Sequence, residues 1–192
     1  IFFEENHILG RYVDIDVYDT NGNGLSRSQF GYDKRKCLIC DDNAFICGRA
    51  MKHSHQEIKN VLMEKYIQYN NYISKREKII KKLGDTALEA MIFEAATSPS
   101  FGLVSPLTQG SHNDMDFFTF LKSSFAIKEG FEKMARISYS YLTLEEAFLI
   151  TRKIGIETEK VMFEATENVN THKGMIFLLG IVIVTAARAL YE

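Results

Sequence analysis

The sequence predicts a mainly α-helical protein, in which an all-α helical bundle follows a small α+β segment. Three observations lead to this fold class. Residues 8–18 alternate apolar and polar side chains, as a half-buried strand does. From about residue 56, apolar side chains recur at helical spacing. The C-terminal part has no alternating stretch, so we expect about five helices and no strand there.

The first expected helices lie between residues 56 and 138. Residues 56–82 form one long or kinked amphipathic helix, and residues 84–98 a second, with Gly84 near the break and Asp85 as N-cap. Both prolines fall in the loop that follows. A third helix covers residues 116–138. Its apolar side is expected to carry Phe117, Phe120, Leu121, Phe125, Phe131 and Met134.

The remaining helices carry clear end signals. Thr143 and Glu146 have the spacing of a capping box, and Gly155 is expected to end the helix that they begin. A short helix is predicted over 158–167, and a strongly apolar one over 173–191. The apolar run at 174–187 has about 14 apolar or small residues, fewer than the roughly 20 that span a bilayer, so we expect a buried helix and no membrane segment.

Composition narrows the class of protein. The 192 residues are 46% hydrophobic and 25% charged, which is typical of a globular chain. Residues 1–82 carry a net charge of +3 and residues 83–192 carry −5, so neither part has the basic surface of a nucleic-acid binder. The start resembles no signal peptide and all three cysteines lie within residues 37–47, which predicts a cytoplasmic protein. Without a starting Met, and ending in a helix-like run, the chain is expected to be a fragment.

A pair of carboxylates stands in the predicted strand. The period of two places Asp14 and Asp16 on the same face, where they could share a divalent cation such as Mg²⁺. Enzymes that transfer phosphoryl or nucleotidyl groups use such pairs to hold Mg²⁺ against a polyphosphate. Two solvated carboxylates on the exposed face of a strand are the alternative.

A second constellation collects every cysteine of the chain. Cys37, Cys40, Cys47 and His53 have the ligand types and spacing of a tetrahedral Zn²⁺ site. A single CxxC pair lacks the second pair of a strong zinc signature. Reduced structural cysteines in a tight turn therefore remain an equal alternative.

The third constellation joins two loops that each precede a helix, "GSHNDMDF" at 110–117 and "NVNTHKG" at 168–174. Helix N-termini attract anions, and Lys173 and His172 would add donors for a phosphate. His112, Asp114 and Asp116 could place a divalent cation against the same polyphosphate. In the alternative, Thr171 and Asp114 only cap helices and His172 satisfies a backbone carbonyl.

These motifs resemble two known families. "FGLV", "GSHNDMDF" and "NVNTHKGMIFLLG" resemble triphosphoribosyl-dephospho-CoA synthases, in which a Gly stands where this chain has Asn168, a residue that tolerates positive φ. "GRYVDIDVYD" and "RKCLICDDNAFICGRAMKHS" resemble the C-terminal part of apo-citrate lyase phosphoribosyl-dephospho-CoA transferases. The order indicates a bifunctional fusion: a transferase-like part at 1–70, a helical linker at 71–82 and a synthase-like part at 83–192.

The resemblance implies two reactions. The synthase part would join ATP to 3′-dephospho-CoA and release adenine. The transferase part would pass the product to a serine of the citrate lyase acyl carrier protein and release pyrophosphate. A non-catalytic, zinc-stapled interaction module on a helical scaffold is the alternative.

The resemblance also implies roles for single residues. The segment that precedes the apolar helix would bind phosphates. The two pairs of aspartates would bind Mg²⁺, and one of two histidines would transfer the proton. Arg11 would face the triphosphate in the transferase part. In the synthase part the residues are Asn170, Thr171, Lys173 and Gly174 for phosphates, Asp114 and Asp116 for Mg²⁺, and His112 or His172 for the proton.

Overall fold

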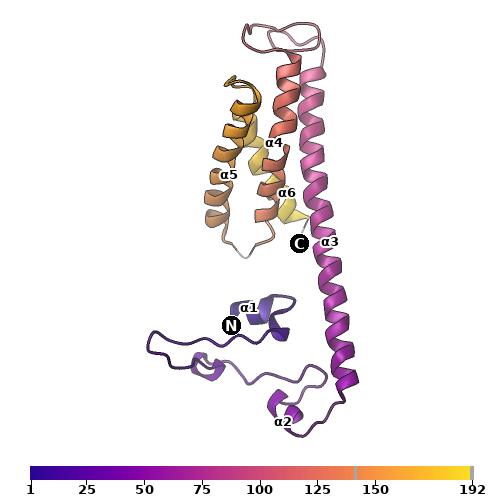
Figure 1. The fold of residues 1–192 in the computed structure, drawn as a ribbon, viewed down its shortest axis with the longest axis vertical. Helices are drawn as coiled ribbons and strands as arrows, with labels where there is room; N and C mark the ends of the chain where they lie inside the picture. Colours follow the sequence, from indigo (N-terminus) through magenta and orange to yellow (C-terminus); the bar gives the residue numbers. More distant parts are fainter. Residues whose placement is uncertain (141, 191–192) are drawn as a thin grey trace. The chain divides into compact units, whose positions relative to one another are not determined.

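The computed structural model describes residues 1–140 and 142–190 and divides into two compact units, Ile1–Ser74 and Lys75–Glu192. Most of its described helical residues are in the second unit (Figure 1). The helix α3, His55–Ala96, crosses the boundary between the units. Each unit is described by itself below.

Unit 1 is irregular, with short helices joined by turns. Its elements are α1 (Phe2–Asn6), the 3₁₀ helices η1 (Gly10–Tyr12) and η2 (Arg27–Phe30), α2 (Ala44–Arg49) and the first part of α3. Two isolated antiparallel bridges, Tyr18–Gly24 and Lys36–Asn43, are the β-pairing of its described residues. The mainly α class is confirmed, whereas the β part is reduced to these bridges.

The strand predicted over residues 8–18 is wrong. Residues 10–12 form η1, residues 14–17 have no regular secondary structure, and Tyr18 makes a single bridge. The apolar set that should have been buried, Val13, Ile15 and Val17, is 37, 54 and 53% exposed. An alternating pattern becomes a sheet strand only where a neighbour pairs its backbone and covers its apolar face, and within this unit no described strand does so.

The break predicted at Gly84 is also wrong, because α3 runs without interruption from His55 to Ala96. Gly84 is buried, and a Cβ there would lie 2.5 Å from the Cγ of Glu132. The glycine therefore lets a neighbouring helix approach, at a helix-propensity cost of about 1 kcal/mol. Asp85 is no N-cap; its carboxylate pairs with Lys128 at 2.8 Å.

Unit 2 is an all-α bundle built from the C-terminal part of α3 with α4 (Phe117–Ile137), α5 (Leu144–Ala165) and α6 (Lys173–Ala189). The helices α4, α5 and α6 pack against one another, and α3 runs along α4 (Figure 1). All four contribute to one apolar core. Its buried members are Ile80, Ala87, Met91, Ile127, Phe131, Met134, Ala135, Tyr139, Met162, Ile176, Ile183 and Ala187.

The buried side of α4 differs from the predicted one. Phe131 and Met134 are buried as expected, but Phe125 is 61% exposed. The adjacent Ser123 and Ser124 take the buried positions at this level. Successive residues of a helix lie about 100° apart, so burying the serines turns Phe125 toward solvent.

The start of α5 is as predicted and its end is not. Thr143 and Glu146 form the expected capping box. Gly155 lies within the helix, where an added Cβ would be 3.7 Å from Met134 Cε and 3.9 Å from Ile176 Cγ2. Helix α5 therefore continues to Ala165, and the separate helix predicted over 158–167 is its last part.

Helix α6 begins at Lys173 as predicted, but the expectation that it is buried holds for one side only, since Phe177, Leu178 and Val182 are exposed. It buries Ile176, Gly180, Ile183 and Ala187, which are three or four residues apart and so form one stripe. No helix among the residues described here is long and apolar enough to cross a membrane.

Candidate functional site

An open groove of about 950 Å³ lies in unit 1. Asp14 and Asp16 both line it, and both are exposed. Outside a paired strand the period of two does not fix where the two carboxylates point, so a cation shared by Asp14 and Asp16 stays a prediction. The groove brings this predicted carboxylate pair to the same cavity as Arg27, Lys34, Arg35, Asn43, Phe45 and Ile46.

The basic side of the groove is held by ion pairs. Arg27 contacts Glu4 at 2.8 Å and Glu5 at 2.6 Å, and Arg35 also pairs with Glu4. Partial burial acts to raise the pKa of Glu4, but the hydrogen bond from Arg27 and the charge of Arg35 outweigh it, so this pKa lies below its ordinary value. Glu4 therefore stays ionised and anchors both guanidinium groups beside the groove.

Arg11 is placed differently from the other basic residues. Its guanidinium donates a hydrogen bond to the carbonyl oxygen of Lys36. Lys36 itself pairs with Asp41 at 3.4 Å, so this ammonium also has a partner within unit 1. Arg11 thus fixes the backbone of the basic run 34–36, two of whose residues line the groove.

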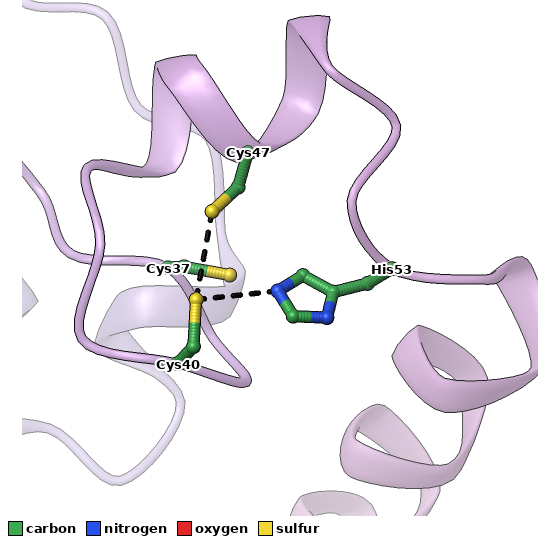
Figure 2. Close-up of side chains that lie close together, drawn as sticks. All are labelled: Cys37, Cys40, Cys47 and His53. Carbon is green, nitrogen blue, oxygen red and sulfur yellow. Dashed lines mark hydrogen bonds between the residues drawn. The ribbon is translucent and has the colours of Figure 1, made fainter.

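The four predicted zinc ligands come together. One ligand atom from each of Cys37, Cys40, Cys47 and His53 lies within 4.8 Å of every other (Figure 2). Cys40 Sγ is 3.5 Å from Cys47 Sγ and 3.3 Å from His53 Nε2. All three cysteines are free thiols. Residues 16 positions apart along the chain therefore form one compact cluster, which we call the thiol cluster.

Two thiols of the cluster have opposite pKa shifts. Hydrogen bonds from the backbone N–H groups of Ile39 and Cys40 lower the pKa of Cys37 to about 6. Burial, and then the neighbouring thiols, raise the pKa of Cys47 to about 12. One thiolate forms readily in this cluster, whereas further negative charge is opposed by low solvation and by the first thiolate.

In unit 2, the loop between α3 and α4 folds the two glycine motifs onto each other. The N–H of Ser111 donates to the carbonyl oxygen of Gly102 at 3.1 Å. Gly110 has φ +62°, and a Cβ there would lie 2.5 Å from the carbonyl oxygen of Leu103. A glycine is required at residue 110 on both grounds. The loop thereby joins "FGLV" to "GSHNDMDF".

The acidic residues of this loop have separate roles. Asp116 is the N-cap of α4: its carboxylate accepts hydrogen bonds from the N–H and the Oγ1 of Thr119, both at 2.8 Å. These bonds lower the pKa of Asp116. Asp114 is exposed and its Oδ1 lies 3.9 Å from Nδ1 of His112, which is also exposed. The helix cap is therefore Asp116 and not Asp114, the residue that the alternative interpretation named as a cap.

The segment before α6 is anchored to α4. Asn168 has φ +69°, in the left-handed region that its amide side chain tolerates. The hydroxyl of Thr171 donates to Ser123 Oγ at 2.7 Å. A backbone turn and a side-chain bond to another helix thus hold the "NVNTHKG" segment in place.

His172 is buried among polar and aromatic groups. Its Nδ1 lies 2.7 Å from Ser123 Oγ, its Nε2 3.4 Å from Ser124 Oγ, and its ring meets Phe120 edge-on at 5.0 Å between centroids. Only 3% of the residue is exposed. Burial lowers its pKa to about 4, so the imidazole is neutral near pH 7.

Lys173 and Asn170 lie at the exposed start of α6. Lys173 Nζ is 3.3 Å from a carboxylate oxygen of Glu159 on α5. The side-chain oxygen of Asn170 accepts a hydrogen bond from the N–H of Lys173 at 3.3 Å. Gly174 is exposed, and a Cβ added to it would meet open space. The loop 97–116 and the start of α6 lie at the same end of the bundle (Figure 1).

The partners of these residues were not predicted from the sequence. Ser123 and Ser124 anchor Thr171 and His172, and Glu159 pairs with Lys173. Two adjacent serines in the middle of an amphipathic helix were the available signal for the first pair. Glu159 gave no signal, because its contact depends on how α5 packs beside α6.

Comparisons with known proteins cover both units. Residues 80–192 match the family model described as ATP:dephospho-CoA triphosphoribosyl transferase. Residues 1–69 match the one described as apo-citrate lyase phosphoribosyl-dephospho-CoA transferase. No solved structure matches the chain.

Several curated proteins are similar to the chain. "Protein CitXG" of Leuconostoc mesenteroides subsp. cremoris is 38% identical over 98% of this chain and 41% of its own length. "Protein CitXG" of Haemophilus influenzae is 35% identical over 100% of this chain and 40% of its own length. A 2-(5''-triphosphoribosyl)-3'-dephosphocoenzyme-A synthase of Haemophilus ducreyi is 32% identical over 78% of this chain and 45% of its own length. The chain therefore spans less than half the length of these relatives.

The order of the two matches along the chain is the order that the sequence motifs predicted. The triphosphoribosyl transferase match alone covers more than half of the residues. The chain therefore belongs to the ATP:dephospho-CoA triphosphoribosyl transferase family and carries, ahead of that region, a segment of the apo-citrate lyase phosphoribosyl-dephospho-CoA transferase family.

Proposed function

We propose that the intact protein builds and attaches the prosthetic group of citrate lyase. The observation that carries this proposal is the tandem match of two transferase families to one chain. The product that one family makes is the substrate that the other consumes, which gives the fusion a chemical reason. The same matches disfavour the non-catalytic scaffold as the function.

In the first proposed reaction, ATP and 3′-dephospho-CoA give 2′-(5″-triphosphoribosyl)-3′-dephospho-CoA and adenine. A ribose hydroxyl of dephospho-CoA attacks the anomeric carbon of the ATP ribose, and the bond to adenine breaks. The hydroxyl loses its proton and the departing adenine gains one. The triphosphate stays on the product, so the site must hold it still while the nucleophile is aligned.

We assign triphosphate binding to the start of α6. Lys173 is exposed, and its partner Glu159 can be exchanged for a phosphate oxygen. Asn170 and the N–H of Gly174 would supply further donors at the positive end of the helix. Thr171, which is hydrogen-bonded to Ser123, would hold these donors in position.

We assign Mg²⁺ binding and proton transfer to the loop between α3 and α4. Asp114, which is exposed, and the α4 cap Asp116 are proposed to hold Mg²⁺ against the triphosphate. Of the two predicted histidines, His112 is the exposed one and is proposed to move the proton. His172 is proposed to be a positioning residue, because it is buried and neutral near pH 7.

The second proposed reaction belongs to the groove of unit 1. A serine of the citrate lyase acyl carrier protein attacks the innermost phosphorus of the triphosphate, and pyrophosphate leaves. Asp14 and Asp16 would hold Mg²⁺ there, and Lys34 and Arg35 would face the phosphates. Arg11 would act by fixing the basic run. We propose a cytoplasmic setting, which the three free thiols support.

The test of the synthase assignment is Lys173→Ala in the intact protein. We expect adenine release from ATP and dephospho-CoA, followed by chromatography, to fall by on the order of 100-fold, as for the loss of one charged stabilising group. Lys153→Ala is the matched control, since Lys153 is an exposed lysine of α5 outside the proposed site. Circular dichroism should show both variants folded. Normal turnover in Lys173→Ala would disprove the phosphate role.

A further inference from the structure

The thiol cluster has the dimensions of a tetrahedral zinc site. A Zn²⁺ ion with Zn–S bonds of about 2.3 Å and a Zn–N bond of about 2.05 Å separates two sulfurs by about 3.8 Å and a sulfur from a nitrogen by about 3.5 Å. The observed separations from Cys40 Sγ are 3.5 Å to Cys47 Sγ and 3.3 Å to His53 Nε2. Small shifts of the ligands would therefore admit the ion, lengthening these two separations and shortening those between ligand atoms that lie up to 4.8 Å apart.

Backbone hydrogen bonds hold two of the ligands, Cys37 and Cys40, in a tight turn. The bridge Lys36–Asn43 closes a tight turn that carries Cys37 and Cys40, and Cys37 N–H donates to the carbonyl oxygen of Asp42 at 2.7 Å. Within the turn, the N–H of Ile39 points at Cys37 Sγ at 3.5 Å. Such donors orient and support a metal-bound thiolate, as outer-sphere groups do in metal sites generally.

The other two ligands come from the next elements of the chain. Cys47 lies in α2, and His53 stands just ahead of α3 (Figure 2). A bound ion would thus link the turn that carries Cys37 and Cys40, helix α2 and the segment before α3. The set of three sulfurs and one nitrogen is complete without water, which is the mark of a structural site and not of a catalytic one.

Unit 1 has little else to hold these segments together. Across residues 1–74, the buried residues are Gly10 and Cys47. A unit of this size with so little buried apolar surface needs another source of stability, and a metal is one of the few available. Metal binding to such a site adds directly to the free energy of folding.

The cluster also adjoins the groove. Asn43, Ala44, Phe45 and Ile46 line the groove, and they lie in sequence between the ligands Cys40 and Cys47. An ion that holds Cys40 and Cys47 in place would therefore also hold both ends of the groove wall that these four residues form.

We propose that Cys37, Cys40, Cys47 and His53 bind one structural Zn²⁺ ion that shapes unit 1 and one wall of its groove. The ion would take part in no step of the proposed reactions. This role is also distinct from the scaffold alternative, since the ion stabilises a unit of an enzyme.

The first experiment measures the metal directly. The reduced 192-residue chain should contain one equivalent of zinc by elemental analysis after dialysis against metal-free buffer. Replacement by Co²⁺ should give the intense visible bands of a tetrahedral thiolate-bound cobalt ion together with sulfur-to-cobalt charge transfer. Neither readout depends on activity, so the proposed function and the metal site can fail separately.

The second experiment uses ligand variants. His53→Gln and Cys40→Ser should each weaken Co²⁺ binding by at least about 100-fold, because even outer-sphere changes cost about 10–100-fold. His55→Gln is the matched control, two residues away, exposed and outside the cluster. It should bind Co²⁺ like the unchanged chain. The far-ultraviolet helical signal, which comes mostly from unit 2, should persist in all three variants.

A chelator supplies a test that needs no variant. Removing zinc should make the 35–54 region sensitive to limited proteolysis, while the helices of unit 2 stay protected. Three results would overturn the proposal: a reduced chain that neither retains zinc nor takes up tetrahedral Co²⁺, equal Co²⁺ affinity in His53→Gln and His55→Gln, or a Cys40–Cys47 disulfide as the stable state under reducing conditions.

Discussion

At the scale of single residues, His172 shows how a reactive side chain can serve structure. From the sequence, this neighbour of Lys173 is expected to bind a phosphate or to transfer a proton. The structure surrounds its ring with Ser123, Ser124 and Phe120. A buried imidazole with hydroxyl partners at both nitrogens stays neutral and keeps one orientation. It therefore ties the segment before α6 to α4.

This burial predicts a pH dependence of stability. The pKa of His172 falls from 6.5 in the unfolded chain to about 4 in the folded one. Between these values the unfolded state binds more protons, so stability is full above about pH 6.5 and is lost as pH falls toward about 4. At about 1.4 kcal/mol per pKa unit, the loss is on the order of 3 kcal/mol.

Urea unfolding at several pH values in this range measures the effect. His172→Gln, whose side chain does not titrate, is the reference, because subtracting its curve removes the contribution of all other groups. A wild-type protein that loses no more stability on acidification than His172→Gln would show that the imidazole is not held neutral.

At the scale of elements, the glycines of the bundle are contact points between helices. Gly84, Gly130 and Gly180 are buried, and a Cβ at any of them would clash with a side chain of another helix. Gly155 is the exception, since its Cβ would make ordinary contacts. Glycine in a helical pattern thus marks close packing at three of these four sites and a helix end at none.

Two alanine substitutions should therefore have opposite effects. Gly130→Ala places a Cβ 2.9 Å from Thr158 Cβ, and Thr158 is held by its hydrogen bond to Ile154, so we expect a loss of about 1–3 kcal/mol from overpacking. Gly155→Ala should gain about 0.5–1 kcal/mol from helix propensity. Thermal and urea unfolding of both variants check the signs. Equal effects of the two substitutions would contradict the packing described for α4 and α5.

At the scale of the whole molecule, the two units differ in how much apolar surface they bury and in where their candidate functional residues lie. Unit 1 has a groove with paired carboxylates and basic residues but few buried side chains. Unit 2 has a continuous apolar core, and its candidate residues lie in the loop between α3 and α4 and around the start of α6, at one end of the bundle. Each proposed reaction draws its residues from one unit, so the two reactions should be separable by mutation.

Asp14→Asn in the intact protein is the test of this separation. It should abolish loading of the acyl carrier protein from preformed triphosphoribosyl-dephospho-CoA, because a Mg²⁺ ligand is lost, and leave adenine release unchanged. Lys173→Ala should show the reverse pattern. Asp33→Asn, an exposed acid of unit 1 that does not line the groove, is the control. Normal carrier loading in Asp14→Asn would refute the metal role of this pair.

The helical class, the capping box at Thr143 and the apolar helix after Lys173 could be predicted from the sequence, because each depends on signals within a few residues. The motifs also predicted both families. The strand at 8–18 and the helix breaks at Gly84 and Gly155 could not be judged locally. A strand needs a partner, and a helical glycine is kept or avoided according to what lies across from it.

For the candidate sites too, some features could be predicted from the sequence and others depend on the tertiary structure. The sequence by itself determined which side chains are available: the aspartate pairs, the three cysteines with His53, and the histidines and lysine before α6. Only the tertiary structure decided that His172 is buried while His112 is exposed, that Asp116 caps a helix, and that the four ligands of the thiol cluster meet. Solvation and distance set the charge and reach of a side chain, and both depend on residues that are remote in the sequence.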